Sequence, residues 1–245
     1  MRLPGDLRRA VASGYLCMRA IDEIEDHPDL PAGEKAVMLE QIGETLSAAR
    51  TESELEALSA LVQSAGAALP RVSRLLPQHA MMAPDGAAQV IWKATAEMAL
   101  RMGHWARSGW RILGEADLDA YTFDVAGRVG LMLNALWKWY DGTDGEPDLA
   151  VGFGRGLQAV NILRNRTEDE ARGVSYFPPA WTAVEMMRYT RRQLDMGESY
   201  LARLPEGPAR EFCQIPLRLA QATLEALDAG ADKLTRDQVI DLIGQ

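Results

Sequence analysis

Hydrophobic residues recur along this chain every three or four positions, which is the repeat of an α-helix with one buried face. Residues 7–27 show the pattern, since Leu7, Val11, Tyr15 and Met18 advance by four, four and three positions. The alternation that marks a half-buried strand is hard to find, and residues that favour helices (Ala, Leu, Glu, Arg and Met) dominate. The pattern predicts an all-α fold of eight to ten helices.

Helix boundaries are also marked in the sequence. Capping boxes stand at Thr51-x-x-Glu54 and Thr235-x-x-Gln238, each ahead of apolar residues in helical spacing. Pro216 falls inside an otherwise helical stretch and is expected to kink or end it. Gly- and Pro-rich breaks are short, and no repeat or flexible linker separates them. We therefore expect one helical domain over residues 1–245.

Charge and composition narrow the possible partners. The chain has 26 Lys and Arg against 35 Asp and Glu, a net charge of −9, so it is a poor partner for nucleic acid. No apolar run approaches the roughly 18–20 residues of a membrane span, and no secretory signal is visible, although peripheral membrane contact stays open. Two cysteines and three histidines are too few for a disulfide framework or a His-rich metal site. We expect a soluble, cytoplasmic protein, and the sequence does not indicate its oligomeric state.

The apolar stripe of residues 7–27 turns acidic at its end. Its next members are Asp22 and Asp26, and a carboxylate on a core-facing stripe is costly if it has no partner. Two carboxylates one helical turn apart can share a hard cation, and Mg²⁺ is commonly bound in this way with a phosphate as co-ligand. The alternative is an acidic helix end that simply faces water.

A second polar stripe lies in residues 152–178. Asn161, Asn165 and Asp169 are each one turn apart, so their oxygen atoms can converge on one point. Gln158 and Glu168 lie beside them, and Arg155, Arg164, Arg166 and Arg172 surround the stripe. Oxygen ligands flanked by arginines suit a metal-bridged phosphate. The alternative is a surface helix with Arg–Glu pairs, although the uncharged Gln158 and Asn161 count against it.

The Gly152-x-Gly154-x-Gly156 sequence lies just ahead of this stripe. No strand precedes it, so it is not a dinucleotide-binding fingerprint. Close packing between helices, or a helix start, explains it better.

Two polar stripes on two helices can face each other across a helical bundle. A di-iron site would need Glu-x-x-His pairs, and the sequence has none. Ligands that are all oxygen atoms indicate Mg²⁺, and Mg²⁺ with arginines indicates a diphosphate. An apolar bundle interior would suit a hydrocarbon tail on that diphosphate. The chemistry that uses these parts is ionisation of an allylic prenyl diphosphate.

These residues resemble the ordered motifs of the squalene/phytoene synthase family. The segment Tyr15–Asp26 resembles its first acidic motif, a helix that ends in DxxED, and Tyr121–Gly130 is similar to its YxxxVAGxVG helix. The segment Gln158–Asp169 resembles QxxNIxRDxxED, and Arg172–Pro178 resembles the tail that follows it. Ile215–Leu224 matches the family's closing helix. The resemblance covers nearly the whole chain.

The resemblance implies an all-α isoprenoid-synthase bundle with a central cavity. It implies that Asp22 and Asp26 bind Mg²⁺ at one wall and that Asn161, Asn165 and Asp169 bind it at the other. Tyr121 would lie near the leaving group, and Asp22, Asp26, Tyr121 and Arg164 are the expected catalytic residues. The residues expected to bind substrate are Arg19, Gln158, Arg164, Arg172 and Tyr176.

Two departures from the family pattern bear on the acceptor, that is, on the second substrate to which the prenyl group is joined. Asn165 stands where the family has Asp, which removes one negative charge, and Asn161-x₃-Asn165-x₃-Asp169 resembles the metal triad of class I terpene cyclases. The chain also starts a few residues before the first acidic helix, so we expect that the family's amino-terminal helix is missing. With that helix absent, one of two diphosphate pockets could be lost, which favours a smaller or different acceptor.

The leading hypothesis is a Mg²⁺-dependent prenyltransferase that joins an allylic carbocation to a second isoprenoid diphosphate. One alternative is prenylation of a small aromatic acceptor such as a carbazole, and another is terpene cyclisation. A non-catalytic assembly factor is the hypothesis from a different class. Tryptophans could stack on an aromatic acceptor, although an ordinary core or rim position is the simpler account of them: Trp92, Trp105, Trp110, Trp137, Trp139 and Trp181.

Overall fold

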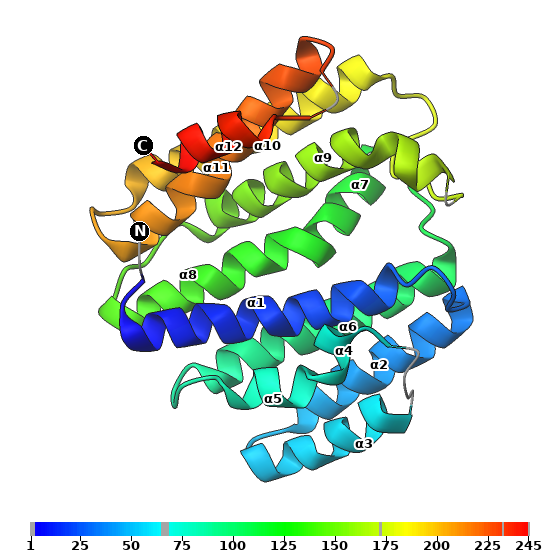
Figure 1. The fold of residues 1–245 in the computed structure, drawn as a ribbon, viewed down its shortest axis with the longest axis vertical. Coiled ribbons are helices and arrows are strands. Elements are labelled where there is room, and N and C mark those ends of the chain that lie inside the picture. Colours follow the sequence, from blue (N-terminus) through cyan, green and yellow to red (C-terminus); the bar gives the residue numbers. More distant parts are fainter. Residues whose placement is uncertain (1–2, 65–68, 172, 232, 245) are drawn as a thin grey trace. The chain divides into compact units, whose positions relative to one another are not determined.

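The computed structural model describes residues 3–64, 69–171, 173–231 and 233–244, and this part of the chain is helical throughout, with no strand (Figure 1). The predicted all-α fold is confirmed. The contacts divide the described chain into two compact units. One contains the residues up to Trp110 together with Ala135–Gly142, and the other contains Arg111–Asn134 and the residues from Thr143 onward. The single domain expected over residues 1–245 stays a prediction.

The first unit is built on two long helices that pack along each other, α2 (Ala32–Ala48) and α6 (Ala88–Ser108). A Cβ on Gly103 would lie 3.0 Å from the carbonyl oxygen of Ala36, so glycine is what permits this close approach. Helix α1 (Gly5–Glu25) packs against α6 and against two short helices, α4 (Arg71–Arg74) and α5 (Leu76–Met81). The unit also contains η1 (Glu52–Leu55) and α3 (Glu56–Ser64). Fully buried side chains from three helices form its core: Ile21, Ile24, Leu39, Ile42 and Ile91.

The second unit surrounds α9 (Pro147–Ala171), which contacts α7 (Glu115–Thr122), η3 (Phe123–Gly127), α10 (Ala183–Arg203) and α11 (Pro208–Asp228). The short helix α12 (Arg236–Gly244) contacts α11. The η3 segment is a π-helical turn, a rare conformation that often occurs at functional sites. Helix α8 (Arg128–Asp141) follows it directly and passes from the second unit into the first.

Glycines allow α9 to lie close to its neighbours. A Cβ on Gly154 would meet the backbone of Ala126 in η3, and a Cβ on Gly156 would lie 2.9 Å from Leu194 of α10. On the α8 side, a Cβ on Gly130 would meet the carbonyl group of Ala150. The close packing predicted for the Gly-x-Gly-x-Gly sequence is therefore confirmed.

Some local predictions are confirmed and others are wrong. Both capping boxes form, with the backbone N–H of Thr51 donating to Glu54 (2.9 Å) and that of Thr235 to Gln238 (2.8 Å). Helix α11 continues through Pro216, so the proline does not end the helix, and a kink at this position stays a prediction. The described residues form the helices labelled α1 to α12, more than the roughly eight to ten expected, partly because Arg71–Arg74 and Leu76–Met81 form two short helices, α4 and α5.

Tyr15 corrects the predicted inward stripe of α1. Leu7, Val11 and Met18 are buried as expected, but the Tyr15 side chain is 64% exposed. Spacing places all four residues on one broad face of the helix, but it does not show which part of that face another helix covers.

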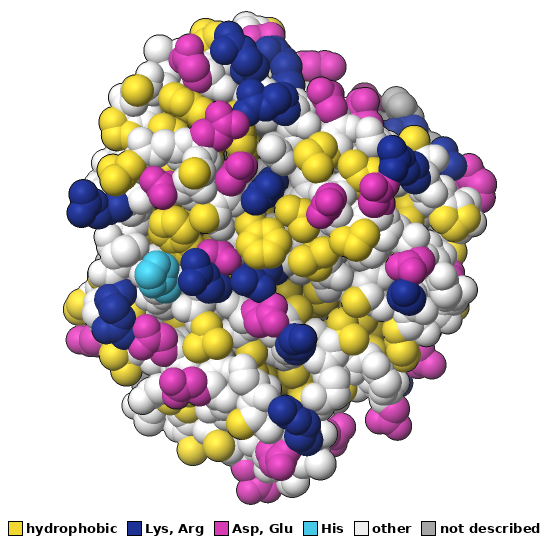
Figure 2. All heavy atoms as spheres, turned by 180° about the vertical axis from the view of Figure 1, so that it is seen from behind, with side chains coloured by type: hydrophobic (Ala, Val, Ile, Leu, Met, Phe, Trp, Pro, Cys, Tyr) yellow, Lys and Arg dark blue, Asp and Glu magenta, His cyan; other side chains and the backbone are white. Residues whose placement is uncertain are grey.

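One face of the molecule carries charged side chains of both signs together with hydrophobic ones (Figure 2). Basic and acidic side chains are interspersed over the face drawn in Figure 2. Among the helices that the structure describes, none has the length and apolar character that a membrane crossing requires.

Candidate functional site

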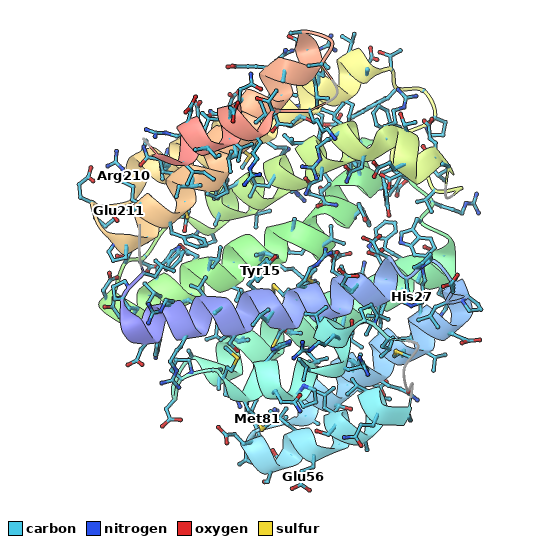
Figure 3. The ribbon with its side chains drawn as sticks, viewed as in Figure 1. Tyr15, His27, Glu56, Met81, Arg210 and Glu211 are labelled. Atoms are coloured by element: carbon cyan, nitrogen blue, oxygen red, sulfur yellow. The ribbon has the colours of Figure 1, made fainter. Side chains whose placement is uncertain are left out.

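The acidic end of α1 belongs to the first unit. Asp22 is half-buried in the last turn of the helix, and Asp26 is exposed at its C-terminal cap, one turn further along. Tyr15 lies midway along the same helix and His27 lies just beyond its end (Figure 3). Arg19, one turn earlier, donates from Nη1 to Oδ2 of Asp22 at 2.6 Å and also pairs with Glu23. The α-helical repeat alone brings these side chains together.

The surroundings of the Asp22 carboxyl group disfavour its negatively charged form. Burial, and next the negative charge of Asp26, raise the pKa of Asp22 from 3.8 to about 6, even though Arg19 acts in the opposite direction. A carboxylate of this kind gains from a cation that approaches its free oxygen. The arrangement therefore fits a metal ligand better than a solvated helix end.

Asp22→Asn is expected to raise the melting temperature of the metal-free protein at pH 7.5 by about 2–4 °C, roughly 1 kcal/mol after allowance for the partial exposure of the side chain. The pKa of Asp22 is higher in the folded state (about 6) than its ordinary value of 3.8. Its destabilising charge is therefore absent below about pH 4, develops as the pH rises through 6, and is constant above that. Thermal unfolding between pH 4 and 8 measures the difference, and a difference independent of pH would contradict the assignment.

Glu25 lies between the two aspartates in sequence but is buried, with 4% of its surface exposed. It accepts a hydrogen bond from Nε1 of Trp110, and Nζ of Lys35 donates to its backbone carbonyl at 2.6 Å. Burial raises the pKa of Glu25 to about 8. The sequence did not reveal this cluster, because Glu25 stands in an acidic run that reads as solvent-exposed.

The second polar stripe runs along α9 in the second unit. Gln158, Asn161 and Asn165 are half-buried, and Asp169 is buried with 7% exposed. Glu168 is exposed, so it does not share the environment of Asp169. The stripe thus combines amide oxygens with one buried carboxylate.

Aromatic residues adjoin the end of this stripe. The backbone N–H of Val174 donates to the carbonyl oxygen of Asp169 at 3.0 Å, which turns the chain back along α9. Tyr176 then stacks on Tyr121 with ring centroids 4.7 Å apart. The guanidinium of Arg166 lies 4.4 Å from the ring centroid of Phe177. The structure therefore places together two predicted site residues, Tyr121 and Tyr176, that are far apart in sequence.

The predicted diphosphate-binding arginines differ in setting. Arg164 is exposed and donates to Oδ1 of Asn165 at 3.1 Å, and Arg19 pairs with the acidic end of α1. Arg172 lies outside the described residues. Arg155 turns away from the stripe, donating to the backbone carbonyl of Asp119 at 3.0 Å.

A further polar network involves the residues on either side of Tyr121 in α7, and it was not visible in the sequence. Tyr189 of α10 donates to Oδ1 of Asp119 at 2.8 Å and lies 3.1 Å from the hydroxyl of Thr122. Burial raises the pKa of Tyr189, so its hydroxyl stays protonated. These contacts fix α7 immediately before the π-helical turn.

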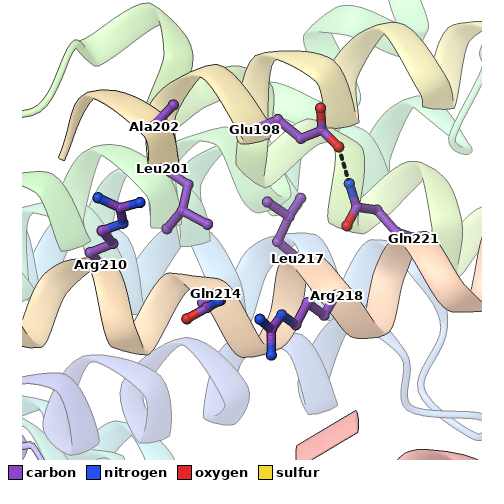
Figure 4. Close-up of a pocket in the computed structure, with 8 residues that line it drawn as sticks. All are labelled: Glu198, Leu201, Ala202, Arg210, Gln214, Leu217, Arg218 and Gln221. Carbon is purple, nitrogen blue, oxygen red and sulfur yellow. Dashed lines mark hydrogen bonds between the residues drawn. The ribbon is translucent and has the colours of Figure 1, made fainter. Parts of the chain in front are cut away.

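A shallow cavity of about 250 Å³ lies between α10 and α11 (Figure 4). Leu201 and Leu217 form its apolar floor, Arg210 and Arg218 lie along it, and Glu198 accepts a hydrogen bond from Gln221. None of the residues that line it is a predicted site residue.

The residues of both stripes fit Mg²⁺ by their chemistry. All the candidate ligand atoms are carboxylate or amide oxygens, and burial together with the charge of Asp26 disfavours the ionised form of Asp22, which a bound cation would favour. Within the described ranges, no group of three or more His, Cys, Asp or Glu gathers into a metal cluster. Mg²⁺ suits such sparse sites, because it is usually bound through one or two carboxylates, water and substrate phosphates.

Comparison with known proteins finds similar sequences over nearly the whole chain. The family model described as squalene/phytoene synthase matches residues 1–186. Squalene synthase of Eremothecium gossypii is 27% identical, with 98% of this chain and 60% of that protein covered. Squalene synthase of Bos taurus is 26% identical, covering 98% of this chain and 64% of that one. The chain thus spans about three fifths of the length of these curated relatives.

A solved structure of TcSQS in complex with the ligand E5700 superposes with a TM-score of 0.77 at 22% identity, covering 99% of this chain and 79% of that one. At that identity the likeness shows the fold alone. The family model covers most of the chain, and the motifs on α1 and α9 lie within it. This chain therefore belongs to the squalene/phytoene synthase family.

Proposed function

We propose that this protein is a Mg²⁺-dependent prenyltransferase, which ionises an allylic prenyl diphosphate and joins the carbocation to a second isoprenoid diphosphate through a C–C bond. The observation that carries the proposal is the acidic pair of a half-buried Asp22 and an exposed Asp26, one turn apart beside Arg19, with the pKa of Asp22 raised to about 6. Family membership supports it, because the relatives named above are squalene synthases.

Each stripe has a part in this chemistry. On α1, Asp22 and Asp26 would bind Mg²⁺, and on α9 the residues that would bind Mg²⁺ are Asn161, Asn165 and Asp169. When bound, Mg²⁺ neutralises the charge that collects on the departing diphosphate. Arginines would bind the remaining diphosphate oxygens in charge-assisted hydrogen bonds: Arg19, Arg164 and Arg172.

The stacked aromatic pair, Tyr121 and Tyr176, has a different role in this chemistry. The C–O bond of the substrate breaks with its electron pair on the diphosphate, which leaves an allylic cation that water would otherwise capture. Tyr121 is only 3% exposed and stacks on Tyr176, and an aromatic ring face of this kind stabilises a cation. Double-bond electrons of the second substrate then form the new C–C bond, and a proton leaves.

Asn165→Asp is expected to lower the Mg²⁺ concentration needed for half-maximal activity by about 3–10-fold, because it adds a negative charge next to the other ligands. The variant keeps an oxygen that can accept from Nε of Arg164, as Asn165 does at 3.1 Å. A Mg²⁺ titration of diphosphate release measures the change. Thr167→Asp is the matched control, because it adds the same charge at an exposed position about 200° around the helix.

The experiment that tests the function is diphosphate release with Mg²⁺ from dimethylallyl, geranyl, farnesyl and geranylgeranyl diphosphates, each offered alone. Release with a coupled hydrocarbon product supports the proposal and identifies the chain length. A cyclic product from one substrate molecule would favour terpene cyclisation instead. Binding with slow release to the alcohol would favour an aromatic acceptor. If no prenyl diphosphate binds and no diphosphate is released, the result contradicts the proposal and favours a non-catalytic role.

A further inference from the structure

The last turn of α1 carries a carboxylate that the proposed reaction does not use. Glu25 lies about 100° around the helix from Asp26, since each residue turns an α-helix by that angle. Its side chain is 4% exposed and accepts from the indole Nε1 of Trp110, whereas Asp26 is exposed and Asp22 is half-buried. Glu25 therefore faces the interior of its unit, and its two acidic neighbours do not.

Trp110 is held in an uncommon backbone conformation at the end of α6. Gly109 ends the helix in the left-handed region with φ 72°, and Trp110 follows with φ 50°. A residue other than glycine keeps such a conformation only where its surroundings determine it. The backbone N–H of Trp110 donates to the carbonyl oxygen of Trp105 at 3.0 Å. This turn directs the indole N–H to Glu25.

Lys35 joins the same two residues from the first turn of α2. Its Nζ, on a side chain that is largely buried, donates to the backbone carbonyl of Glu25 at 2.6 Å and lies 5.5 Å from the centroid of the Trp110 ring. That carbonyl is one of the groups left without a helical partner at the end of α1, where a cation is favourable. Lys35 of α2 and Trp110 at the end of α6 thus both bind the last turn of α1 through Glu25.

We propose that Glu25 is a positioning residue and not a metal ligand: together with Trp110 and Lys35 it fixes the last turn of α1, so that Asp22 and Asp26 are presented one turn apart to the cation. This inference rests on the proposed function, since it concerns the same acidic turn. Groups that orient metal ligands in this way typically change metal affinity by about 10–100-fold when they are replaced.

The anchor itself is tested without metal or substrate. Trp110→Phe keeps an aromatic ring but removes the N–H that Glu25 accepts. Hydrogen exchange of the metal-free protein, followed by mass spectrometry, should become about tenfold faster in peptides that cover residues 22–27. Trp92→Phe is the matched control, because its buried indole also donates one hydrogen bond, to the carbonyl of Ala80 at 3.0 Å, and it is far along α6 from the acidic turn.

The consequence for metal binding is tested with Mn²⁺, whose free concentration electron paramagnetic resonance reports. Trp110→Phe and Glu25→Ala should weaken Mn²⁺ binding by about tenfold or more. Glu25→Gln should stay within about threefold of the wild type, because its amide oxygen still accepts from Trp110. Trp92→Phe should bind as the wild type does.

The outcomes separate the alternatives. If Glu25 were a ligand, Glu25→Gln would lose as much affinity as Asp22→Asn while Trp110→Phe would bind normally, and the inference would be overturned. Unchanged hydrogen exchange in Trp110→Phe would also overturn it. If the exchange and Mn²⁺ results hold but no prenyl diphosphate is consumed, the inference stands and the proposed function fails.

Discussion

Asp26→Asn is expected to lower the rate of diphosphate release by about a thousandfold, which corresponds to about 4 kcal/mol of lost transition-state stabilisation. The substitution removes one of two carboxylates that would hold the cation from α1, while Asp26 itself is exposed and at the helix cap. Helix α1 keeps its buried residues, so circular dichroism and the melting temperature should change little. Single-turnover release of diphosphate from the preferred substrate measures the loss, and Asp22→Asn should lose a similar share of this rate.

A charge-matched control distinguishes this effect from a general change in surface charge. Asp29 is exposed in the loop that follows α1 and lies outside both stripes. Asp29→Asn removes the same charge three residues further along and should leave the rate within about twofold of the wild type. If Asp26→Asn and Asp29→Asn lose the same share of the release rate, the effect comes from the change in local electrostatic field and not from a lost ligand. If both variants release diphosphate at the wild-type rate, α1 does not provide the metal site.

The fold was predictable where the signal is local. Thr51 and Glu54 form their capping box because the interaction needs only the two side chains and the first helical turn. Tyr15 shows the limit of such reasoning, since spacing places it on the buried side and the structure leaves it exposed. The π-helical turn at Phe123–Gly127 has no counterpart in the hydrophobic pattern, because one extra residue in a turn changes that pattern too little to detect.

In the candidate site, too, some features follow from local sequence and others depend on the fold. The pairing of Asp22 with Arg19 follows from positions three residues apart on a helix, although Arg19 was expected only to bind substrate. The Tyr121–Tyr176 stack joins residues that only the fold brings together, so the resemblance indicated each residue separately and did not indicate the stack. Glu25 was misleading, because a buried carboxylate and a solvated one look the same in an acidic run.

Gly130→Ala and Gly154→Ala are each expected to destabilise the second unit by about 3 kcal/mol or more, the upper part of the range for overpacked sites. A Cβ at Gly130 would collide with the carbonyl of Ala150, and one at Gly154 with the carbonyl of Ala126. Both obstacles are backbone atoms, which cannot rotate away as a side chain can, so α9 would have to move from α8 and η3. Chemical denaturation followed by circular dichroism measures the loss.

Gly33→Ala provides the comparison for these two substitutions. Gly33 lies in the first turn of α2, and a Cβ there meets nothing within 4 Å, so alanine should be neutral or stabilise the protein by up to about 1 kcal/mol. Because α9 carries Asn161, Asn165 and Asp169, the glycine variants should also lose activity in proportion to the displacement of that helix. Variants as stable as the wild type would show that α9 does not approach α8 and η3 this closely, and the placement of its polar stripe relative to Tyr121 would then need revision.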